Sequence, residues 1–148
     1  MILIDTNVVI DARTRGSPFH RWAEQLIVDA LSTEGVALNA IVLAELCVGH
    51  HDPKSIGTEL RAKGVNILDV PAATAAICGR AYSRYRTARR TSGGGRAPHT
   101  PLPNFFVGAH AELMNWKLAT RDTERYRLYF PDVELIQPQS CKAEKLKS

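Results

Sequence analysis

The chain of 148 residues has few cysteines and no long apolar run, and each shortage excludes a class of protein. No segment approaches the roughly 20 consecutive apolar residues that a membrane-spanning helix needs, so we expect no association with a membrane. The three cysteines, Cys47, Cys78 and Cys141, lie far apart and form no C-x-x-C pair. This usage argues against a disulfide framework or a zinc knuckle and is typical of a reducing cytoplasm. The segment Met1–Asp5 lacks the basic region of a signal peptide, so we expect a cytoplasmic protein.

Acidic residues are absent from Val70 to Ala111, although the chain as a whole carries a formal net charge of only +4. The arginines of this stretch are Arg80, Arg84, Arg86, Arg89, Arg90 and Arg96. A block of one sign is an electrostatic footprint for a polyanion such as a nucleic acid. A solvated helix face followed by a loop gives the same pattern, so charge alone does not decide the function.

What the chain does contain is the composition of a single folded domain. Hydrophobic residues make up 45% and charged residues 23%, which is typical of globular proteins, and the length suffices for a proper core. We assign residues 1–138 to one domain and expect the polar, lysine-rich tail 139–148 to be disordered.

The hydrophobic pattern predicts strands that alternate with helices. Strands are predicted at residues 1–4, 36–38, 65–70, 118–120 and 133–136. Helices are predicted at residues 18–34, 40–48, 53–63, 71–90 and 105–117, with a Gly/Pro-rich loop at 91–103. Ser17 and Pro18 are predicted to begin the first helix as N-cap and first helical residue. Strands separated by helices, without hairpin signals, predict an α/β fold whose parallel sheet is covered by helices on both faces.

Carboxylates occur at or after three of the predicted strands. Asp5 ends the first strand, Glu45 lies in the helix after the second, and Asp122 follows the fourth. Because ligand sites of parallel sheets form beyond the carboxyl ends of the strands, we expect these side chains to converge. Hard divalent cations such as Mg²⁺ and Mn²⁺ prefer such oxygen ligands, completed by water and substrate phosphate. Thr6 and Asn7 are weaker candidates to hydrogen-bond a phosphate or a metal-bound water.

Each acid also has an ordinary structural interpretation. Asp5 is a good turn former or N-cap, Glu45 suits a solvated helix face, and Asp122 is placed to pair with Arg121 or Arg125. Taken singly, each acid favours the structural interpretation. Together, at three strand ends of one small domain, they favour a metal site.

Four blocks of the sequence resemble the motif blocks of PIN-domain toxins of the VapC type. The blocks are Ile2–Val8, Leu43–Leu46, Pro103–Ala111, and Thr120–Asp122 continued by Tyr126–Pro131. The blocks cover nearly the whole chain in the family's order and spacing, and four together are more specific than the first alone.

The resemblance implies a three-layer α/β/α sandwich around a parallel sheet. It also implies Mg²⁺- or Mn²⁺-dependent endonucleolytic cleavage of single-stranded or structured RNA, with Asp5, Glu45 and Asp122 as the metal-binding acids. The basic block would then draw in the RNA backbone. As a toxin of a toxin–antitoxin pair, the protein would form a homodimer and bind a cognate antitoxin.

Asn104 departs from the family, which usually has an aspartate at this position. Asparagine still offers a neutral carbonyl ligand, so we keep Asn104 among the catalytic candidates, but it removes one negative charge from the site. As an N-cap after Pro103, Asn104 would also begin a helix well, but aspartate caps equally well and capping does not explain the difference. The sequence leaves open whether Asn104 is natural or introduced, and we expect an impaired site.

Two other functions remain to be weighed. A haloacid-dehalogenase-like phosphatase also begins with a strand and an aspartate, but that family needs a second aspartate where this chain has Asn7. A catalytically silent module that binds nucleic acid or an antitoxin is compatible with Asn104 and with the arginines. Metal-dependent turnover of RNA separates the enzyme from the module.

Overall fold

The structure, a computed structural model, describes residues 1–91 and 102–139. Its centre is a five-stranded sheet in the order β3-β2-β1-β4-β5, and every neighbouring pair of strands is parallel. The strands are β1 (Ile2–Ile4), β2 (Val36–Asn39), β3 (Asn66–Leu68), β4 (Lys117–Ala119) and β5 (Leu135–Ile136). The helices are α1 (Thr6–Arg13), α2 (His20–Leu31), α3 (Ala40–Cys47), α4 (Pro53–Ala62), α5 (Thr74–Thr91), α6 (Leu102–Met114) and α7 (Thr123–Tyr129).

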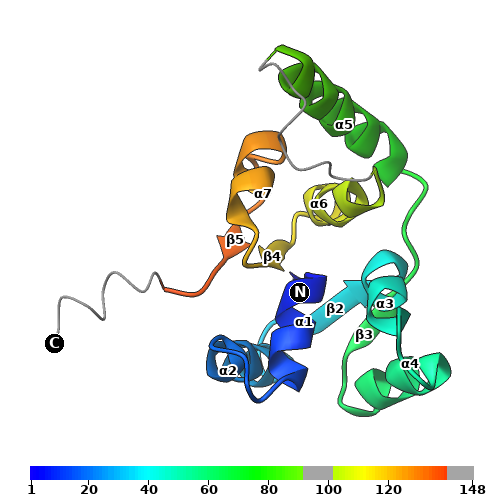
Figure 1. Ribbon diagram of the computed structural model, residues 1–148, viewed down its shortest axis with the longest axis vertical. Helices are drawn as coiled ribbons and strands as arrows, with labels where there is room; N and C mark the ends of the chain where they lie inside the picture. The colour runs from blue at the N-terminus through cyan, green and yellow to red at the C-terminus, as the bar shows by residue number, and fades with distance from the viewer. Residues whose placement is uncertain (92–101, 140–148) are drawn as a thin grey trace, which may run out of the picture.

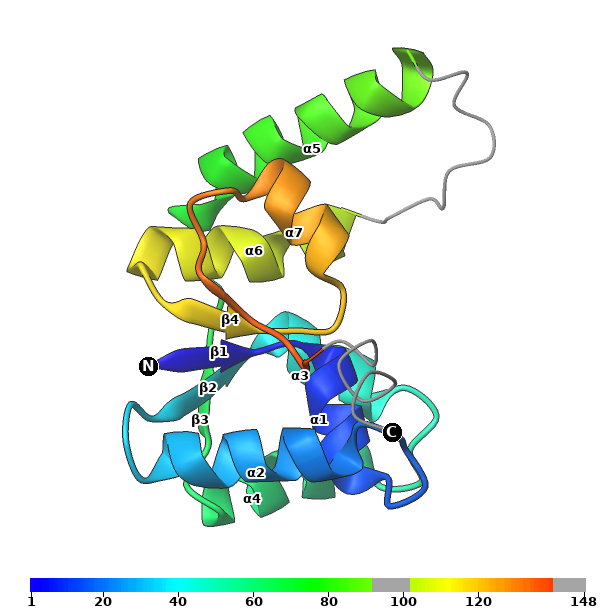
Figure 2. The ribbon, with the colours of Figure 1, turned by 90° about the vertical axis from the view of Figure 1, so that its left-hand side faces the viewer.

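Helices cover both faces of the sheet, which confirms the predicted three-layer α/β/α sandwich. Figures 1 and 2 show α1, α2 and α4 on one side and α5, α6 and α7 on the other. The central strands β1 and β2 are buried along their whole length. Their near-continuous apolar sequences follow from this burial, because a parallel sheet between two helix layers exposes neither face to water.

The order of the strands creates one place where the chain changes face. Strands β1 and β4 are neighbours, but α1 follows β1 on one face and α7 follows β4 on the other (Figure 2). At such a switch point the connections diverge and leave a crevice at the carboxyl ends of the strands. Asp5 lies between β1 and α1, and Asp122 lies between β4 and α7, so both residues lie beside this crevice.

Close packing between two helices fixes the wall of this crevice. A Cβ atom built on Gly108 of α6 would lie 2.5 Å from Cδ2 of Phe130, the residue that follows α7. Only a glycine lets the Phe130 ring lie directly against the α6 backbone. This contact sets the distance between α6 and α7.

Two helices were not predicted from the sequence. No helix was predicted after the first strand, but the N-cap interpretation of Asp5 is confirmed: Asp5 is the N-cap of α1, and its side chain accepts a hydrogen bond from Thr6 N. The short helix α7 was also missed, because its seven residues present little periodicity.

Some predicted boundaries were wrong. Helix α2 begins at His20 rather than Pro18; the Ser17 hydroxyl accepts from Phe19 N and donates to Asp11 instead of capping a helix. Helix α6 begins at Leu102, so Asn104 lies in its first turn and is not its N-cap. Residues 92–101, which include Arg96 and most of the predicted loop, lie outside the described residues, as do residues 140–148 of the predicted tail with Cys141.

Neither described cysteine, Cys47 nor Cys78, forms a disulfide bond. Within residues 1–91 and 102–139, the structure contains no helix that is both long enough and apolar enough to cross a membrane.

Candidate active site

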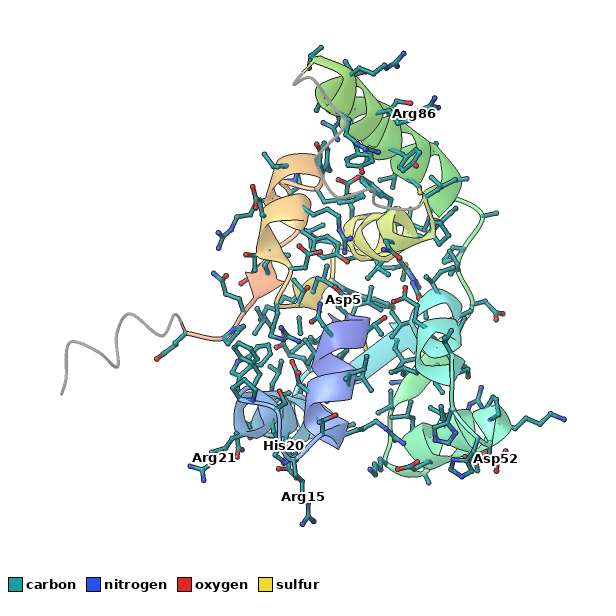
Figure 3. All side chains as sticks on the ribbon, viewed as in Figure 1. Asp5, Arg15, His20, Arg21, Asp52 and Arg86 are labelled. Atoms are coloured by element: carbon teal, nitrogen blue, oxygen red, sulfur yellow. The ribbon has the colours of Figure 1, made fainter. Side chains whose placement is uncertain are left out.

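The four catalytic candidates from the sequence, three acids and one asparagine, line one pocket of about 270 Å³. Asp5, Glu45, Asn104 and Asp122 all contribute to its wall, although they come from four separate parts of the chain. Its remaining lining residues are Thr6, Asn7, Ile10, Val107, Arg125 and Tyr126. Figure 3 shows Asp5 at the centre of the molecule, where α1 begins. We refer to this hollow as the acidic pocket.

Asp5 is the most constrained residue of the acidic pocket and is only 6% exposed. Its Oδ1 accepts a hydrogen bond from Thr6 N at 2.8 Å. Its Oδ2 accepts from Thr120 Oγ1 at 2.8 Å and from Tyr126 OH at 3.0 Å, with Asn7 Nδ2 at 3.4 Å. These hydrogen bonds fix both carboxylate oxygens in position. Folding alone therefore sets the orientation of Asp5.

Tyr126 contributes a buried phenol to this network that the sequence reasoning missed. Burial raises the pKa of Tyr126 well above its usual value, and the neighbouring Asp5 carboxylate raises it further. The phenol therefore keeps its proton and donates a hydrogen bond to Asp5. The signal in the sequence was indirect. Tyr126 belongs to a motif block, but a single aromatic residue in such a segment is usually interpreted as part of the hydrophobic core.

Arg125 is the second residue that the sequence reasoning did not place in the site. Its Nη2 lies 3.1 Å from Asp122 Oδ2, and it donates to Tyr126 OH at 3.2 Å. Its guanidinium carbon lies 4.9 Å from the centroid of the Tyr126 ring. Burial opposes the charge of Arg125, but Tyr126, Asp122 and Asp5 outweigh it, so the pKa of Arg125 is raised. One cation thus stands among the acids of the pocket.

Glu45 and Asn104 approach the pocket from two helices that one side-chain contact joins. The Oδ1 atom of Asn39, at the end of β2, caps α3 by accepting hydrogen bonds from the backbone N–H groups of Ile41 and Val42. The Nδ2 atom of Asn39 lies 3.2 Å from Nδ1 of His110 on α6. His110 is buried, and burial lowers its pKa. The helices that carry Glu45 and Asn104 are therefore linked through two buried polar residues.

The donors of the acidic pocket suit a hard divalent cation that retains water. Among the described residues that line the pocket, the donors are all oxygen atoms, from the carboxylates, the Asn104 side-chain carbonyl and the Thr6 hydroxyl, and no cysteine or histidine is present. Within residues 1–91 and 102–139, no three His, Cys, Asp or Glu side chains form a ready-made metal cluster. Mg²⁺ is usually held by one or two carboxylates with water and phosphate, so the absence of a closed cage does not conflict with it. Thr6 Oγ1 is buried without a hydrogen-bond partner and is available to a bound water.

The arginines of the basic block lie mainly on α5, away from the acidic pocket. Arg80 and Arg84 line a separate hollow together with Glu112 and Asp132, and Arg84 Nη2 donates to Tyr129 O at 3.0 Å. None of the five described arginines of the block lines the acidic pocket. Figure 3 shows Arg86 on α5, well removed from Asp5.

The sequence matches the model of the PIN domain family over residues 2–131. Among curated proteins, no sequence matches this chain significantly.

Several solved structures of toxin–antitoxin proteins share the fold. A chain of FitAcB from Neisseria gonorrhoeae is 28% identical, with a TM-score of 0.63, and the match covers 93% of this chain and 98% of that one. A chain of VapBC2 from Rickettsia felis, bound to a DNA fragment of its promoter, is 21% identical with a TM-score of 0.62, covering 94% of this chain and all of that one. VapC20 from Mycobacterium tuberculosis, which cleaves the sarcin–ricin loop, is 13% identical with a TM-score of 0.61, covering 93% of this chain and all of that one.

Proposed function

The chain belongs to the PIN-domain family, and we propose that it is a Mg²⁺- or Mn²⁺-dependent endoribonuclease that acts as the toxin of a toxin–antitoxin pair. The observation that carries this proposal is the acidic pocket. Three carboxylates and one amide from distant parts of the chain line a single hollow at the switch point of the sheet. A fold has no structural need to gather acids in this way, because like charges repel each other.

Asp5, Glu45 and Asp122 would hold the cation, with the side-chain carbonyl of Asn104 beside them. A bound divalent ion would orient a water molecule, favour its deprotonation and neutralise charge that develops on the scissile phosphate. Thr120 and Tyr126 fix the direction of the Asp5 carboxylate by their hydrogen bonds. The chain therefore presents one rigid acid and two exposed ones to the reacting phosphate.

The arginines of α5 would supply the sequence-independent part of RNA binding. Arg80, Arg84, Arg86 and Arg90 are exposed, and they belong to a stretch that contains no acid. Contacts of this kind act on the phosphate backbone and weaken steeply as salt rises. Their distance from the acidic pocket suits an RNA that extends beyond the scissile bond.

The partners would be a second copy of the chain and an antitoxin, and the place of action would be the cytoplasm. Among the solved structures that share the fold is a toxin–antitoxin complex from Klebsiella pneumoniae, which supports the antitoxin as a partner. We expect an antitoxin segment to lie across the acidic pocket and to direct an arginine at Asp5 or Asp122, where its charge would substitute for the cation.

A catalytically silent binding module is the second candidate, and two observations favour it. Asn104 leaves the acidic pocket with one negative charge fewer than the family pattern, and Arg125 already forms an ion pair with Asp122. Such a module would retain the fold and the arginines of α5 but would not turn over RNA.

The substitution Glu45→Gln tests the proposal. Glu45 is exposed and forms no ion pair with any residue of the ranges 1–91 and 102–139, so its loss should remove a ligand without disturbing the fold. We expect Mn²⁺-dependent cleavage of single-stranded RNA to fall by at least about a hundredfold, the scale of losing one group that stabilises developing charge. The matched control is Glu124→Gln, which removes the same charge from the exposed surface of α7, outside the pocket.

If Glu45→Gln cleaves RNA at the rate of the parent, Glu45 is not a ligand of the cation. If the parent folds normally but shows no metal-dependent cleavage, the silent module is favoured instead.

A further inference from the structure

Arg125 is the only cationic side chain among the described residues that line the acidic pocket. Its side chain is 16% exposed, whereas the side chain of its partner Asp122 is 46% exposed. The ion pair therefore differs from an ordinary surface pair, in which both groups are solvated and contribute little. In this pair, the cation is held by the protein and the anion is open to the solvent.

Three features hold Arg125 in this position. The three-residue spacing from Asp122 places the guanidinium within reach of its carboxylate. The Tyr126 ring lies beneath the guanidinium, and the Tyr126 hydroxyl accepts a hydrogen bond from it. Because the same hydroxyl donates to Asp5, the chain of contacts runs from Asp122 through Arg125 and Tyr126 to Asp5.

The pairing leaves the guanidinium only partly satisfied. The Nε–H group of Arg125 is buried and has no hydrogen-bond partner. An arginine buried only to complete the core would be expected to satisfy its N–H groups, because an unpaired buried donor is costly. The position of Arg125 is better explained by its charge, which opposes that of the acids around it.

We propose that Arg125 is the internal counter-cation of the acidic pocket, and that a divalent cation must separate Asp122 from Arg125 in order to bind. The inference rests on the proposed metal-dependent function, since it concerns the same acids. Arg125 lowers the negative potential of the pocket and competes directly for one of its exposed carboxylates. The pocket consequently binds a divalent cation more weakly than its three acids alone would.

The opposite role for Arg125 makes the opposite prediction. If Arg125 served to orient Asp122 toward a cation, its removal would leave Asp122 free to rotate and would weaken binding. The direction of the change in affinity therefore separates a competitor from a positioning residue.

The test is a calorimetric titration of Mn²⁺ into the parent protein and into Arg125→Gln, in low salt and without RNA. We expect Arg125→Gln to tighten Mn²⁺ binding by about tenfold, the scale of one nearby charge in a site of this kind. Arg125→Lys retains the charge and should stay close to the parent. Arg127→Gln removes the same charge from an exposed position of α7 outside the pocket, and should change the affinity by less than about twofold.

Circular dichroism of each variant checks the fold, and Arg125→Met, which retains the apolar stem over the Tyr126 ring, replaces Arg125→Gln if the latter does not fold. Equal or weaker Mn²⁺ binding by the folded neutral variant overturns the inference. If the parent binds Mn²⁺ and Glu45→Gln weakens that binding, the proposed metal site stands even when Arg125→Gln has no effect. If neither the parent nor the neutral variant binds Mn²⁺, the metal site and the inference both fall.

Discussion

The acidic pocket has two unlike halves. In the buried half, the Asp5 carboxylate is enclosed and accepts hydrogen bonds from Thr120 and Tyr126. In the exposed half, Glu45 and Asp122 are open to solvent, and Asn104 is half-buried in the first turn of α6. Both halves offer side-chain oxygen atoms to a cation, but only in the buried half is a carboxylate enclosed by hydrogen-bond donors of the protein.

The difference follows from the cost of burying charge. A buried carboxylate must be compensated by hydrogen bonds, so the residues around it must supply donors within the core. An exposed carboxylate is solvated by water and needs no partner until a ligand arrives. The buried half should therefore contribute to stability as well as to function, and the exposed half to function alone.

The largest effect that tests this comparison is the stability change of Asp5→Asn. The new amide would turn an N–H group toward donors that now meet an oxygen, either Thr6 N or the pair Thr120 and Tyr126. An unsatisfied buried polar group costs about 1–3 kcal/mol, so we expect Asp5→Asn to lower the free energy of unfolding by that amount. Urea denaturation measures it.

Glu45→Gln is the paired control for this measurement, because an exposed substitution should stay within about 0.5 kcal/mol of the parent. Equal losses of stability in the two variants would contradict the division of the pocket into two halves.

The sequence predicted the acids of the pocket because topology places them. Once parallel strands were inferred, residues that follow β1 and β4 had to meet at one edge, whatever the details of the helices. Tyr126 and Arg125 could not be predicted in the same way. Their roles depend on the rotation of α7 about its axis, which depends on packing between residues far apart in the sequence, such as Phe130 against Gly108.

The basic block shows the same limit. Its charge pattern predicted a surface for a polyanion, and four of its arginines are indeed exposed on α5. The pattern could not indicate that Arg80 and Arg84 lie near Glu112 and Asp132, which are distant in the sequence. Local charge patterns report composition along the chain, whereas the field at a site depends on every element packed around it.

The next effect concerns the exposed half. With Asn104 the pocket holds one negative charge fewer than the family pattern, and divalent affinity depends partly on the number of charged ligands. At an effective dielectric constant of about 20, a charge about 4 Å from a divalent ion contributes several kcal/mol before desolvation offsets much of it. We expect Asn104→Asp to tighten Mn²⁺ binding by about tenfold, equivalent to about 1.4 kcal/mol, and to raise RNA cleavage.

The stability of Asn104→Asp without metal should change little. A negative charge in the first turn of α6 is favourable, but the nearby acids of the pocket repel it. Calorimetric titration of Mn²⁺ into both proteins measures the affinity, and Ser83→Asp, which adds the same charge to exposed α5, is the control. Equal affinities of Asn104→Asp and the parent would place Asn104 outside the ligands of the cation.

The smallest expected effect concerns the link between the two helices of the exposed half. Asn39 caps α3 and contacts His110 on α6, and burial lowers the pKa of His110 below its ordinary value of 6.5. The unfolded chain therefore binds a proton at this histidine at a higher pH than the folded protein does. The resulting stability is present above about pH 6.5 and is lost as the pH falls from there toward the lowered pKa of the folded state.

Urea denaturation of the parent and of His110→Gln between pH 7.5 and about 5.5 isolates this contribution, because carboxylates titrate mostly below that range. Glutamine retains a side-chain oxygen that can accept from Asn39 Nδ2 but does not titrate. We expect the parent to lose stability over this range more steeply than His110→Gln does. If both proteins show the same slope, protonation of His110 does not weaken the link between α3 and α6, and acid would leave the exposed half of the pocket as firmly placed as the buried half.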